Sequence, residues 1–382
     1  MDFAPMPQPK TELGRYRILS STAGVRVSPL ILGGMSLGAA WSEGFGGGSF
    51  EDSYKLLDAW YGAGGNFVDV SNNYHNGESE IVLGKWMAER GIRDQIVVAT
   101  KYTQYYKPAG DPDQRINYAG NHSKSLLLSV RDSLAKLQTE YIDVLYLHWW
   151  DYTTSVSEVM QSLDRLVKSG KVLYLGISDT PAWIVSKANE YARAHALTPF
   201  SIYQGQWNLA LRDLERDIIP MALSEGMAIA PWGVMGAGKF KTEAEVEART
   251  KAGIPLRHNR PQTEDDKKVA AALDKIAQEV GGGATGANVA LAWSLAKFPS
   301  IFPLVGGWKA DQALSNIEAL NIKLTKEQIA ELESTVPFQR GVPYNVFGTD
   351  PVNTAEGNWT TLFGAVAGHI RHNTRTPTRS GP

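Results

Sequence analysis

The chain of 382 residues contains no cysteine, which excludes disulfide bonds, a thiolate nucleophile and cysteine-ligated metals. It also lacks an excess of charge of one sign, because the formal net charge is -2, so the sequence gives no indication of binding to nucleic acid or to an anionic membrane. No apolar run approaches the roughly 20 residues of a membrane span. The first ten residues, MDFAPMPQPK, lack the basic and apolar regions of a secretory signal. From these absences we expect a cytoplasmic protein.

Short apolar runs alternate with amphipathic helical patterns along most of the chain. Eight runs are predicted to be strands, at residues 30–32, 67–70, 96–101, 142–147, 172–177, 200–204, 227–231 and 301–305. Uninterrupted apolar strands are typical of a parallel sheet that is covered on both faces. Strict alternation over this length favours an α/β fold, a (β/α)8 TIM barrel.

A doubly wound open sheet is the alternative fold. It is disfavoured because no Gly-x-Gly-x-x-Gly motif follows the first strand. Residues 44–48 are rich in glycine but do not directly follow a strand, so we expect a flexible loop there.

We expect residues 1–382 to form a single domain, with a barrel core at about residues 13–337. A β-hairpin should precede the barrel, with strands at 16–19 and 25–27 and a turn at Ala23-Gly24. Residues 338–382 do not continue the repeat. Their aromatic part is expected to fold over the barrel mouth, and the polar, basic end from residue 369 is expected to be a flexible tail; the aromatic residues are Tyr344, Phe347, Trp359 and Phe363.

Four polar residues stand at the ends of three predicted strands. Asp69, Lys101 and His148 lie at or just beyond the ends of apolar runs, and Tyr74 follows five residues after Asp69. A charged residue that closes a buried strand is costly unless it is paired or has a function. Each residue alone is compatible with a structural role, such as a hydrogen-bonded histidine or a salt bridge. Together they favour one shared site, because the carboxyl ends of barrel strands meet at one mouth.

These four side chains suit the reduction of a carbonyl group. A tyrosine with a pKa near 10 is a usable proton donor, and a neighbouring Lys101 ammonium should lower that pKa. Asp69 would hold the lysine charged and in place. His148 would donate a hydrogen bond to the carbonyl oxygen, and Tyr74 would protonate the alkoxide as hydride arrives.

The motifs around these residues resemble those of the aldo-keto reductase family. FVDVSNNYHNGESE resembles the family signature, and VVATKY and DVLYLHWWD resemble its lysine and histidine strands. The resemblance extends from about residue 13 to about residue 337. LYLGISDTPAW, YQGQWNL, ERDIIPMALSEGMAIAPW and FPLVGG are similar to the fungal aryl-alcohol dehydrogenase branch, which includes norsolorinic-acid-reductase-like proteins. By this resemblance the four residues are a catalytic tetrad with Tyr74 as general acid.

The resemblance also implies that NADP(H) lies extended across the barrel mouth, without a Rossmann fold. Ser178 and Gln204 match positions that hold the nicotinamide carboxamide, and Trp232 matches an aromatic on which the ring stacks, although Trp232 could instead be a core residue at the rim. Asp179 stands where the family often has Asn. The remaining matches are the loop residues Gly233, Gly238 and Lys239, the pair Gly306 and Gly307 before a helix, and the adenosine-end residues Lys309, Gln312 and Asn316. Backbone N–H groups of glycine-rich loops and helix starts can bind phosphate.

Lys309 could pair with the 2′-phosphate of NADP, although Trp308 stands where relatives in this branch commonly carry Arg. Aromatic residues are predicted around the mouth, which favours a flat or aromatic substrate; they are Trp41, Phe45, Tyr102, Tyr105, Tyr106, Trp149, Trp150 and Trp207. Several of them could instead pack loops together. We therefore expect reversible reduction of aromatic aldehydes or ketones, with a larger aromatic polyketide as an alternative substrate.

Two other functions remain as alternatives. The first is a slow or non-catalytic NADP-binding regulatory protein on the same scaffold, similar to potassium-channel β-subunits, which the complete set of four residues disfavours. The second is a metal-dependent hydrolase, which needs converging His and carboxylate ligands. Only His148 closes a strand, while His75 and His122 lie in loops or helix starts, so no metal is expected. The sequence leaves the oligomeric state open.

Overall fold

Eight parallel strands form a barrel in the computed structural model, which describes residues 6–42, 47–107, 113–251 and 261–350. The strands are β3 (Ile31–Gly33), β4 (Phe67–Asp69), β5 (Val97–Tyr102), β6 (Ile142–Leu147), β7 (Val172–Ser178), β8 (Phe200–Gln206), β9 (Ala228–Trp232) and β10 (Leu304–Val305). They pair in the order β10-β3-β4-β5-β6-β7-β8-β9. A parallel bridge between Ile229 and Ile301 brings β9 against the segment before β10. This confirms the predicted (β/α)8 barrel.

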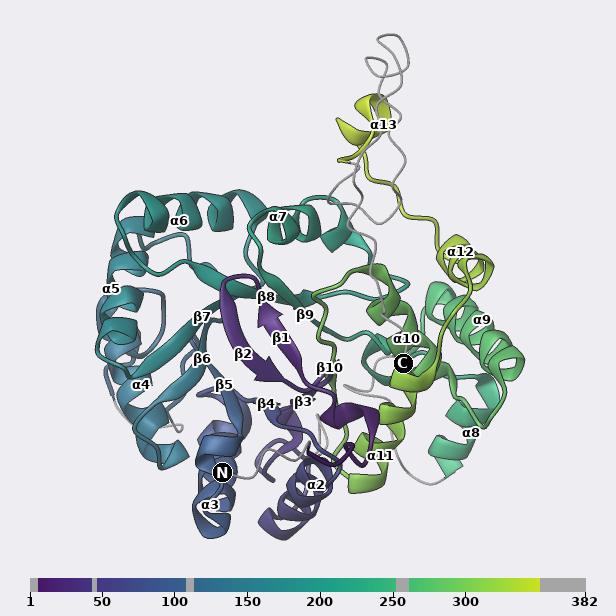
Figure 1. The fold of residues 1–382 in the computed structure, drawn as a ribbon, viewed down its shortest axis with the longest axis horizontal. Coiled ribbons are helices and arrows are strands. Elements are labelled where there is room, and N and C mark those ends of the chain that lie inside the picture. Colours follow the sequence, from purple (N-terminus) through teal and green to yellow (C-terminus); the bar gives the residue numbers. More distant parts are fainter. Residues whose placement is uncertain (1–5, 43–46, 108–112, 252–260, 351–382) are drawn as a thin grey trace.

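Helices follow the strands along the chain, and most of them surround the barrel (Figure 1). They are α2 (Phe50–Gly62), α3 (Glu78–Arg90), α4 (Ser123–Leu137), α5 (Val156–Lys168), α6 (Ala182–Ala194), α7 (Ile218–Ser224), α8 (Glu243–Lys251), α9 (Glu264–Val280), α10 (Gly286–Lys297), α11 (Ala310–Ser315), α12 (Lys326–Ser334) and α13 (Tyr344–Phe347). Short 3-10 helices lie in the connections, at η1 (Glu12–Gly14), η2 (Gly34–Ser36), η3 (Tyr74–Gly77), η4 (Arg93–Gln95), η5 (Ile116–Tyr118), η6 (Asp213–Glu215), η7 (Gly236–Gly238) and η9 (Asn316–Asn321). Several helices begin with the expected caps. In α2, for example, the Ser49 side chain accepts a hydrogen bond from the backbone of Asp52, whose carboxylate binds back to Ser49.

The hairpin is present, but its turn differs from the prediction. Strands β1 (Arg17–Ser20) and β2 (Ala23–Val27) pair antiparallel, so the turn lies between them and Ala23-Gly24 belongs to β2. The Ser20 hydroxyl accepts a hydrogen bond from the backbone N–H of Thr22 at 3.3 Å. This local bond stabilises the turn in place of a glycine.

The hairpin closes one end of the barrel (Figure 1). Its apolar side chains join the cluster that fills the barrel interior, whose members include Leu19, Ala23, Val27, Phe67, Val144, Tyr146, Ile202 and Phe302. A second and larger cluster lies between the strands and the surrounding helices. Because the hairpin covers one end, the carboxyl ends of the strands remain as the open mouth.

The C-terminal segment contacts the rim of the mouth through polar groups. Arg216 Nε donates to the carbonyl of Arg340 at 2.8 Å, and Arg340 donates to the carbonyl of Glu215 at 2.6 Å. Tyr344 hydrogen-bonds to Asp217, and α13 projects beyond the ring of helices (Figure 1). No residue from 338 to 350 lines the mouth cavity.

Polar contacts with the β8–α7 connection therefore hold residues 338–350 at the rim of the mouth, outside the cavity wall. Trp359, Phe363 and the basic end lie outside the described residues.

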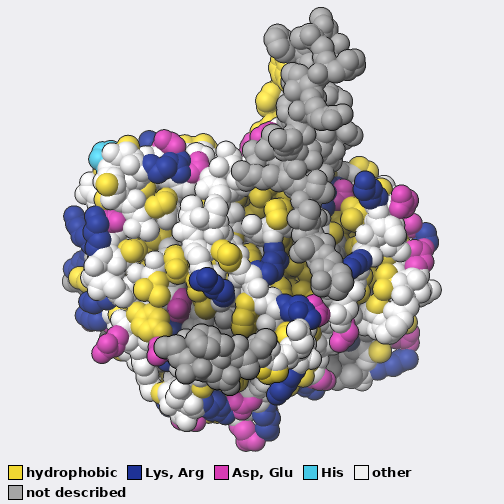
Figure 2. Space-filling model, viewed as in Figure 1, with side chains coloured by type: hydrophobic (Ala, Val, Ile, Leu, Met, Phe, Trp, Pro, Cys, Tyr) yellow, Lys and Arg dark blue, Asp and Glu magenta, His cyan; other side chains and the backbone are white. Residues whose placement is uncertain are grey.

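Charges of both signs are interspersed over the face seen in Figure 2, with apolar side chains scattered between them. This agrees with the small net charge of the sequence. Among the described residues, no helix is long and apolar enough to cross a bilayer.

The contact between α3 and α4 provides a test of the fold. A Cβ added at Gly84 would meet the carbonyl oxygen of Lys136 and lie 2.6 Å from backbone atoms of Leu137. We expect Gly84→Ala to lower the free energy of unfolding by about 1–3 kcal/mol, measured by urea denaturation. Gly62→Ala is the matched control, since nothing lies within 4 Å of its Cβ, and it should be neutral or slightly stabilising. Equal effects of the two substitutions would contradict the close approach of the helices.

Candidate active site

A cavity of about 1110 Å³ opens at the carboxyl ends of the barrel strands. Asp69, Tyr74 and His148, three of the four predicted catalytic residues, lie in its wall. Lys101 lies behind them and does not reach the wall. It is also not the last residue of its strand, because β5 continues to Tyr102.

Lys101 is 1% exposed and forms a buried ion pair with Asp69. Its ammonium also donates to the carbonyl of Val70 at 2.8 Å. The other carboxylate oxygen of Asp69 accepts a hydrogen bond from Gln204 Nε2 at 2.9 Å. Burial alone would lower the pKa of Lys101, but Asp69 and Tyr74 outweigh it and raise the pKa. Lys101 is therefore a charged ammonium whose nitrogen lies 4.9 Å from the centre of the Tyr74 ring.

Tyr74 begins η3, where the chain turns sharply after β4. His75 and Asn76 have positive φ angles of 48° and 56°. The His75 ring links this turn to the loop after β3, since Nδ1 accepts from the backbone N–H of Trp41 at 3.0 Å and Nε2 lies 2.9 Å from the carbonyl of Met35. The position of Tyr74 is thus fixed by side-chain bonds to a neighbouring loop.

Burial raises the pKa of Tyr74 above its usual value. Lys101 lowers this pKa, as the sequence predicts, but does not overcome the effect of burial. The predicted effect of Lys101 is thus present, but burial outweighs it and the net shift of the Tyr74 pKa is upward. Tyr74 carries its proton throughout the neutral range, as a proton donor must.

His148 directly follows β6 and faces Tyr74, with the two ring centres 6.0 Å apart. Burial, aided by the charge of Lys101, holds the pKa of His148 well below its usual value. The imidazole is therefore neutral. Its Nδ1 lies 3.4 Å from the hydroxyl of Ser71, which leaves Nε2 as the ring nitrogen for a bound molecule.

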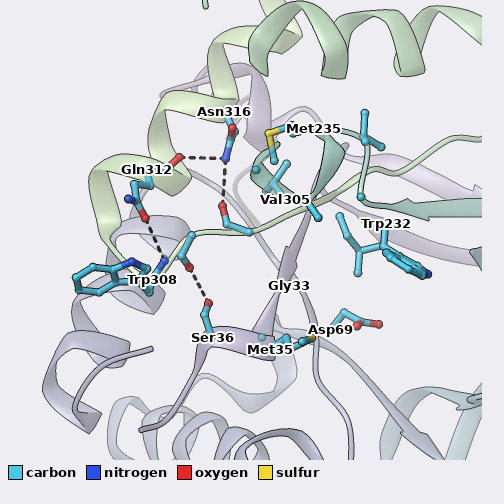
Figure 3. Close-up of a pocket in the computed structure, with 18 of the residues that line it drawn as sticks. Gly33, Met35, Ser36, Asp69, Trp232, Met235, Val305, Trp308, Gln312 and Asn316 are labelled. Carbon is cyan, nitrogen blue, oxygen red and sulfur yellow. Dashed lines mark hydrogen bonds between the residues drawn. The ribbon is translucent and has the colours of Figure 1, made fainter. Parts of the chain in front are cut away.

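Most of the residues predicted to bind a cofactor lie in the same wall. They are Ser178, Gln204, Trp232, Gly233, Gly238, Gly306, Gly307, Gln312 and Asn316. Figure 3 shows how part of this wall is braced: Asn316 Nδ2 donates to the carbonyl of Gln312 at 3.0 Å, and Gln312 Oε1 accepts from the backbone N–H of Trp308 at 3.2 Å. Gly307 has a φ of 149°, and a Cβ there would lie 3.0 Å from Cβ of Gln312. A side chain at this position would be strained and crowded.

Two predicted cofactor residues, Lys239 and Lys309, are not part of the cavity wall. Lys239 instead donates to the Asp266 carboxylate at 2.7 Å. The nitrogen of Lys309 lies 4.7 Å from the ring centre of Trp308. Lys239 is thus bound by a neighbouring carboxylate, and Lys309 lies over the ring of the adjacent Trp308.

Other wall residues were not predicted from the sequence. Asn73 and Gln104 line the cavity and share a hydrogen bond of 2.6 Å; the position of Asn73 directly before Tyr74 was a usable signal. Lys241 and Arg249 also line it. Arg249 lies in the polar helix α8, where no local pattern indicates a site. Asp179 lines the cavity as well.

The aromatic residues predicted at the mouth divide into two groups. Trp41 and Trp149 line the cavity, and Trp149 is 41% exposed. Five others do not, and pack within the structure around it; they are Tyr102, Tyr105, Tyr106, Trp150 and Trp207. These five residues agree with the alternative that such aromatic side chains pack loops together. Phe45 lies outside the described residues.

Residues 29–337 match the sequence model of the Aldo/keto reductase family, which covers well over half of the chain. The chain belongs to the aldo/keto reductase family. Members of this family are oxidoreductases, so the chain is an oxidoreductase. Among the described residues of this reductase, no group of three or more His, Asp or Glu side chains is placed to hold a metal ion.

Fungal proteins are similar to this reductase over nearly its whole length. It is 51% identical over 355 residues to the aryl-alcohol dehydrogenase [NADP(+)] of Phanerodontia chrysosporium, covering 91% of this chain and 92% of the relative. It is 50% identical over 354 residues to norsolorinic acid reductase of Aspergillus flavus, covering 93% and 89%. It is also 50% identical over 355 residues to aldo-keto reductase ausK of Aspergillus calidoustus, covering 92% and 89%.

The geometry of Tyr74 leads to a prediction for the chemical step. Tyr74→Phe keeps the ring but removes the acidic proton, so the rate of carbonyl reduction should fall on the order of 100-fold or more. The affinity for NADPH should change little. Stopped-flow measurement of the chemical step and a fluorescence titration of NADPH would test both expectations. Tyr102→Phe is the control, because it removes a buried hydroxyl that contacts the carbonyl of Asn121 instead of the cavity. A Tyr74→Phe enzyme that retained most of its rate would show that another group supplies the proton.

Proposed function

We propose that this aldo/keto reductase reduces aromatic aldehydes or ketones to alcohols, reversibly, with NADPH as cofactor. The observation that carries the proposal is the placement of Tyr74 and a neutral His148 in one cavity wall, with the buried Lys101 ammonium behind Tyr74. The cofactor supplies hydride when bound. The chain must then hold the carbonyl group, stabilise the developing negative charge and deliver a proton.

Each of these tasks has a residue in the wall. His148 is neutral, so its Nε2 can hydrogen-bond to the carbonyl oxygen without bringing a charge of its own. Tyr74 gives its proton to the same oxygen as the alkoxide forms. Lys101 stabilises the phenolate that remains, and Asp69 keeps Lys101 protonated in a buried position. In the reverse direction the phenolate accepts the proton of the alcohol.

The cavity suits an extended dinucleotide together with a substrate. A volume of about 1110 Å³ is at the upper end for small-molecule sites. Ser178 and Gln204 supply polar side chains beside Trp232, which offers an aromatic face. The glycines after β9 and β10 let backbone approach a ligand closely. A similar fungal protein is named for the use of NADP(+), which supports the same cofactor here.

An aromatic substrate is supported by Trp41 and Trp149, which line the cavity. The names of two relatives point to aromatic compounds of very different size, an aryl alcohol and norsolorinic acid. We favour a small aromatic aldehyde or ketone. Reduction of a larger aromatic polyketide is the second candidate, for which the size of the cavity is the specific observation.

The proposal also includes a single domain over residues 1–382 and a cytoplasmic location, the latter supported by the absence of cysteine. A slow or non-catalytic role would require a defect in the proton-donating group. The charged Lys101 and protonated Tyr74 give no sign of one.

The two tryptophans at the mouth predict substrate preference. We expect kcat/KM for a benzaldehyde-type substrate to exceed that for a propanal-type substrate by roughly tenfold, since stacking and burial favour the aromatic ring. Trp149→Ala should reduce this ratio by lowering the value for the aromatic substrate alone. Assays that follow NADPH consumption with both substrates would measure the ratio. Equal kcat/KM for the two classes in the wild-type enzyme would argue against an aromatic pocket.

The preference for NADPH over NADH should depend on basic residues near the cavity. Arg249 lies in the cavity wall. Lys309 is the exposed N-cap residue of α11 and follows the wall residue Trp308, so we expect its flexible side chain to turn toward a phosphate. A charge-assisted hydrogen bond contributes about 1.5–3 kcal/mol, or roughly 10- to 150-fold in affinity.

We expect Lys309→Met and Arg249→Met each to weaken NADPH binding toward the lower end of that range while leaving the Kd for NADH nearly unchanged. Titrations with both cofactors test this. Equal losses for NADPH and NADH would mean that neither residue reads the 2′-phosphate, and a wild-type preference for NADH would overturn the choice of cofactor.

A further inference from the structure

Asp179 places a carboxylate in the cavity among the residues that we assign to nicotinamide. It directly follows β7 and lines the cavity with Ser178, Gln204 and Trp232. Its backbone N–H donates to the carbonyl of Gln204 at 3.0 Å, and its φ is 39°. A positive φ at a residue other than glycine is strained and is often found at ligand sites. The side chain is enclosed by protein but exposed to the cavity itself.

The neighbours of Asp179 do not neutralise its charge. Its carboxylate makes no ion pair with any residue that the structure describes. The charged and titratable groups that interact with it electrostatically are Lys101 from β5, Tyr74 in η3 and Tyr203 from β8. Lys101 is already paired with Asp69, and both tyrosines have raised pKa values and carry no charge at neutral pH. Ser178 and Trp232 provide hydrogen bonds only.

The ionisation of Asp179 falls within an accessible pH range. Burial raises its pKa to about 6, while the bonds to Trp232 and Ser178 and the charge of Lys101 pull in the opposite direction. The carboxyl is therefore neutral near pH 5 and negatively charged near pH 8. His148 stays neutral in this range because its own pKa lies well below its usual value.

We propose that the Asp179 carboxylate makes the site distinguish the oxidised from the reduced cofactor, favouring NADP⁺ over NADPH. This inference rests on the proposed function, which places the nicotinamide ring beside Trp232. The ring carries a positive charge when oxidised and none when reduced. A carboxylate that lines the cavity without an ion-pair partner among the described residues attracts the charged form of the ring more strongly than the neutral form. Opposite charges at binding-site distances change affinity about tenfold or more.

The effect should follow the ionisation of Asp179. Below its pKa the carboxyl is neutral and the preference for NADP⁺ is absent. Above its pKa the preference is complete. The 2′-phosphate ionises in the same range, but it is common to both cofactor forms and cancels in the ratio of their dissociation constants. That ratio therefore isolates charges that lie near the nicotinamide ring.

The experiment measures Kd for NADP⁺ and for NADPH by calorimetric titration of the whole protein at pH 5 and pH 8, without substrate. We expect the ratio of Kd for NADPH to Kd for NADP⁺ to rise about tenfold from pH 5 to pH 8. Asp179→Asn keeps the shape of the side chain, and Asn tolerates a positive φ. In this variant the ratio at pH 8 should fall about tenfold and lose its dependence on pH.

Asp311→Asn is the matched control. Asp311 neighbours the wall residue Gln312 but does not line the cavity, so its loss should change both dissociation constants by the same factor. A wild-type ratio that is constant from pH 5 to pH 8, or an Asp179→Asn ratio equal to that of the wild type, would overturn the inference while leaving cofactor binding intact. Failure of both cofactors to bind the wild-type protein would instead overturn the proposed function, and this inference with it.

Discussion

The ion pair between Lys101 and Asp69 is the interaction on which the rest of the site depends. Both groups are almost completely buried, and the loss of one partner from a buried pair typically costs about 3–5 kcal/mol because the other charge stays uncompensated. Groups on or next to several strands bind the remaining polar atoms of this buried ion pair. Val70 follows β4 and Gln204 belongs to β8, and each provides one of the remaining hydrogen bonds. The ion pair and its hydrogen bonds therefore connect β4 and β5 with β8 at the mouth.

Burial around this pair also sets the state of the two groups that face a substrate. It raises the pKa of Tyr74 and lowers the pKa of His148, so that both are neutral in the neutral range. The two shifts have one cause but opposite signs, since burial disfavours the charged form of each group. Lys101 adds to the shift of His148 and opposes the shift of Tyr74. A fixed cation behind two neutral hydrogen-bonding groups is suited to a negative charge that appears only during reaction.

The sequence predicted those parts of the molecule that local pattern determines. The apolar strands give the barrel, and Asp69, Tyr74 and His148 follow from their places near strand ends. The contacts of individual side chains were less predictable. The hairpin turn depends on the Ser20 side chain, and the positions of Lys239 and Lys309 depend on Asp266 and Trp308. To predict the net pKa shift of Tyr74 one must know how deeply its side chain is buried, and no sequence motif gives this.

Two carboxylates at one end of the barrel differ because their surroundings differ. Asp69 is enclosed with the Lys101 ammonium and the Gln204 amide, and it holds Lys101 in place. Asp179 opens into the cavity without an ion-pair partner in the described region, which leaves its charge available to whatever fills the space. Burial raises the pKa of both carboxyl groups, but at Asp69 an ion pair with Lys101 and a hydrogen bond from Gln204 oppose the shift. In this barrel one carboxylate supports the proposed proton donor, and the other presents its charge to a cavity whose wall also includes Lys241 and Arg249. If a nicotinamide ring binds beside Trp232 as we propose, its charge state is therefore the property to which Asp179 should respond.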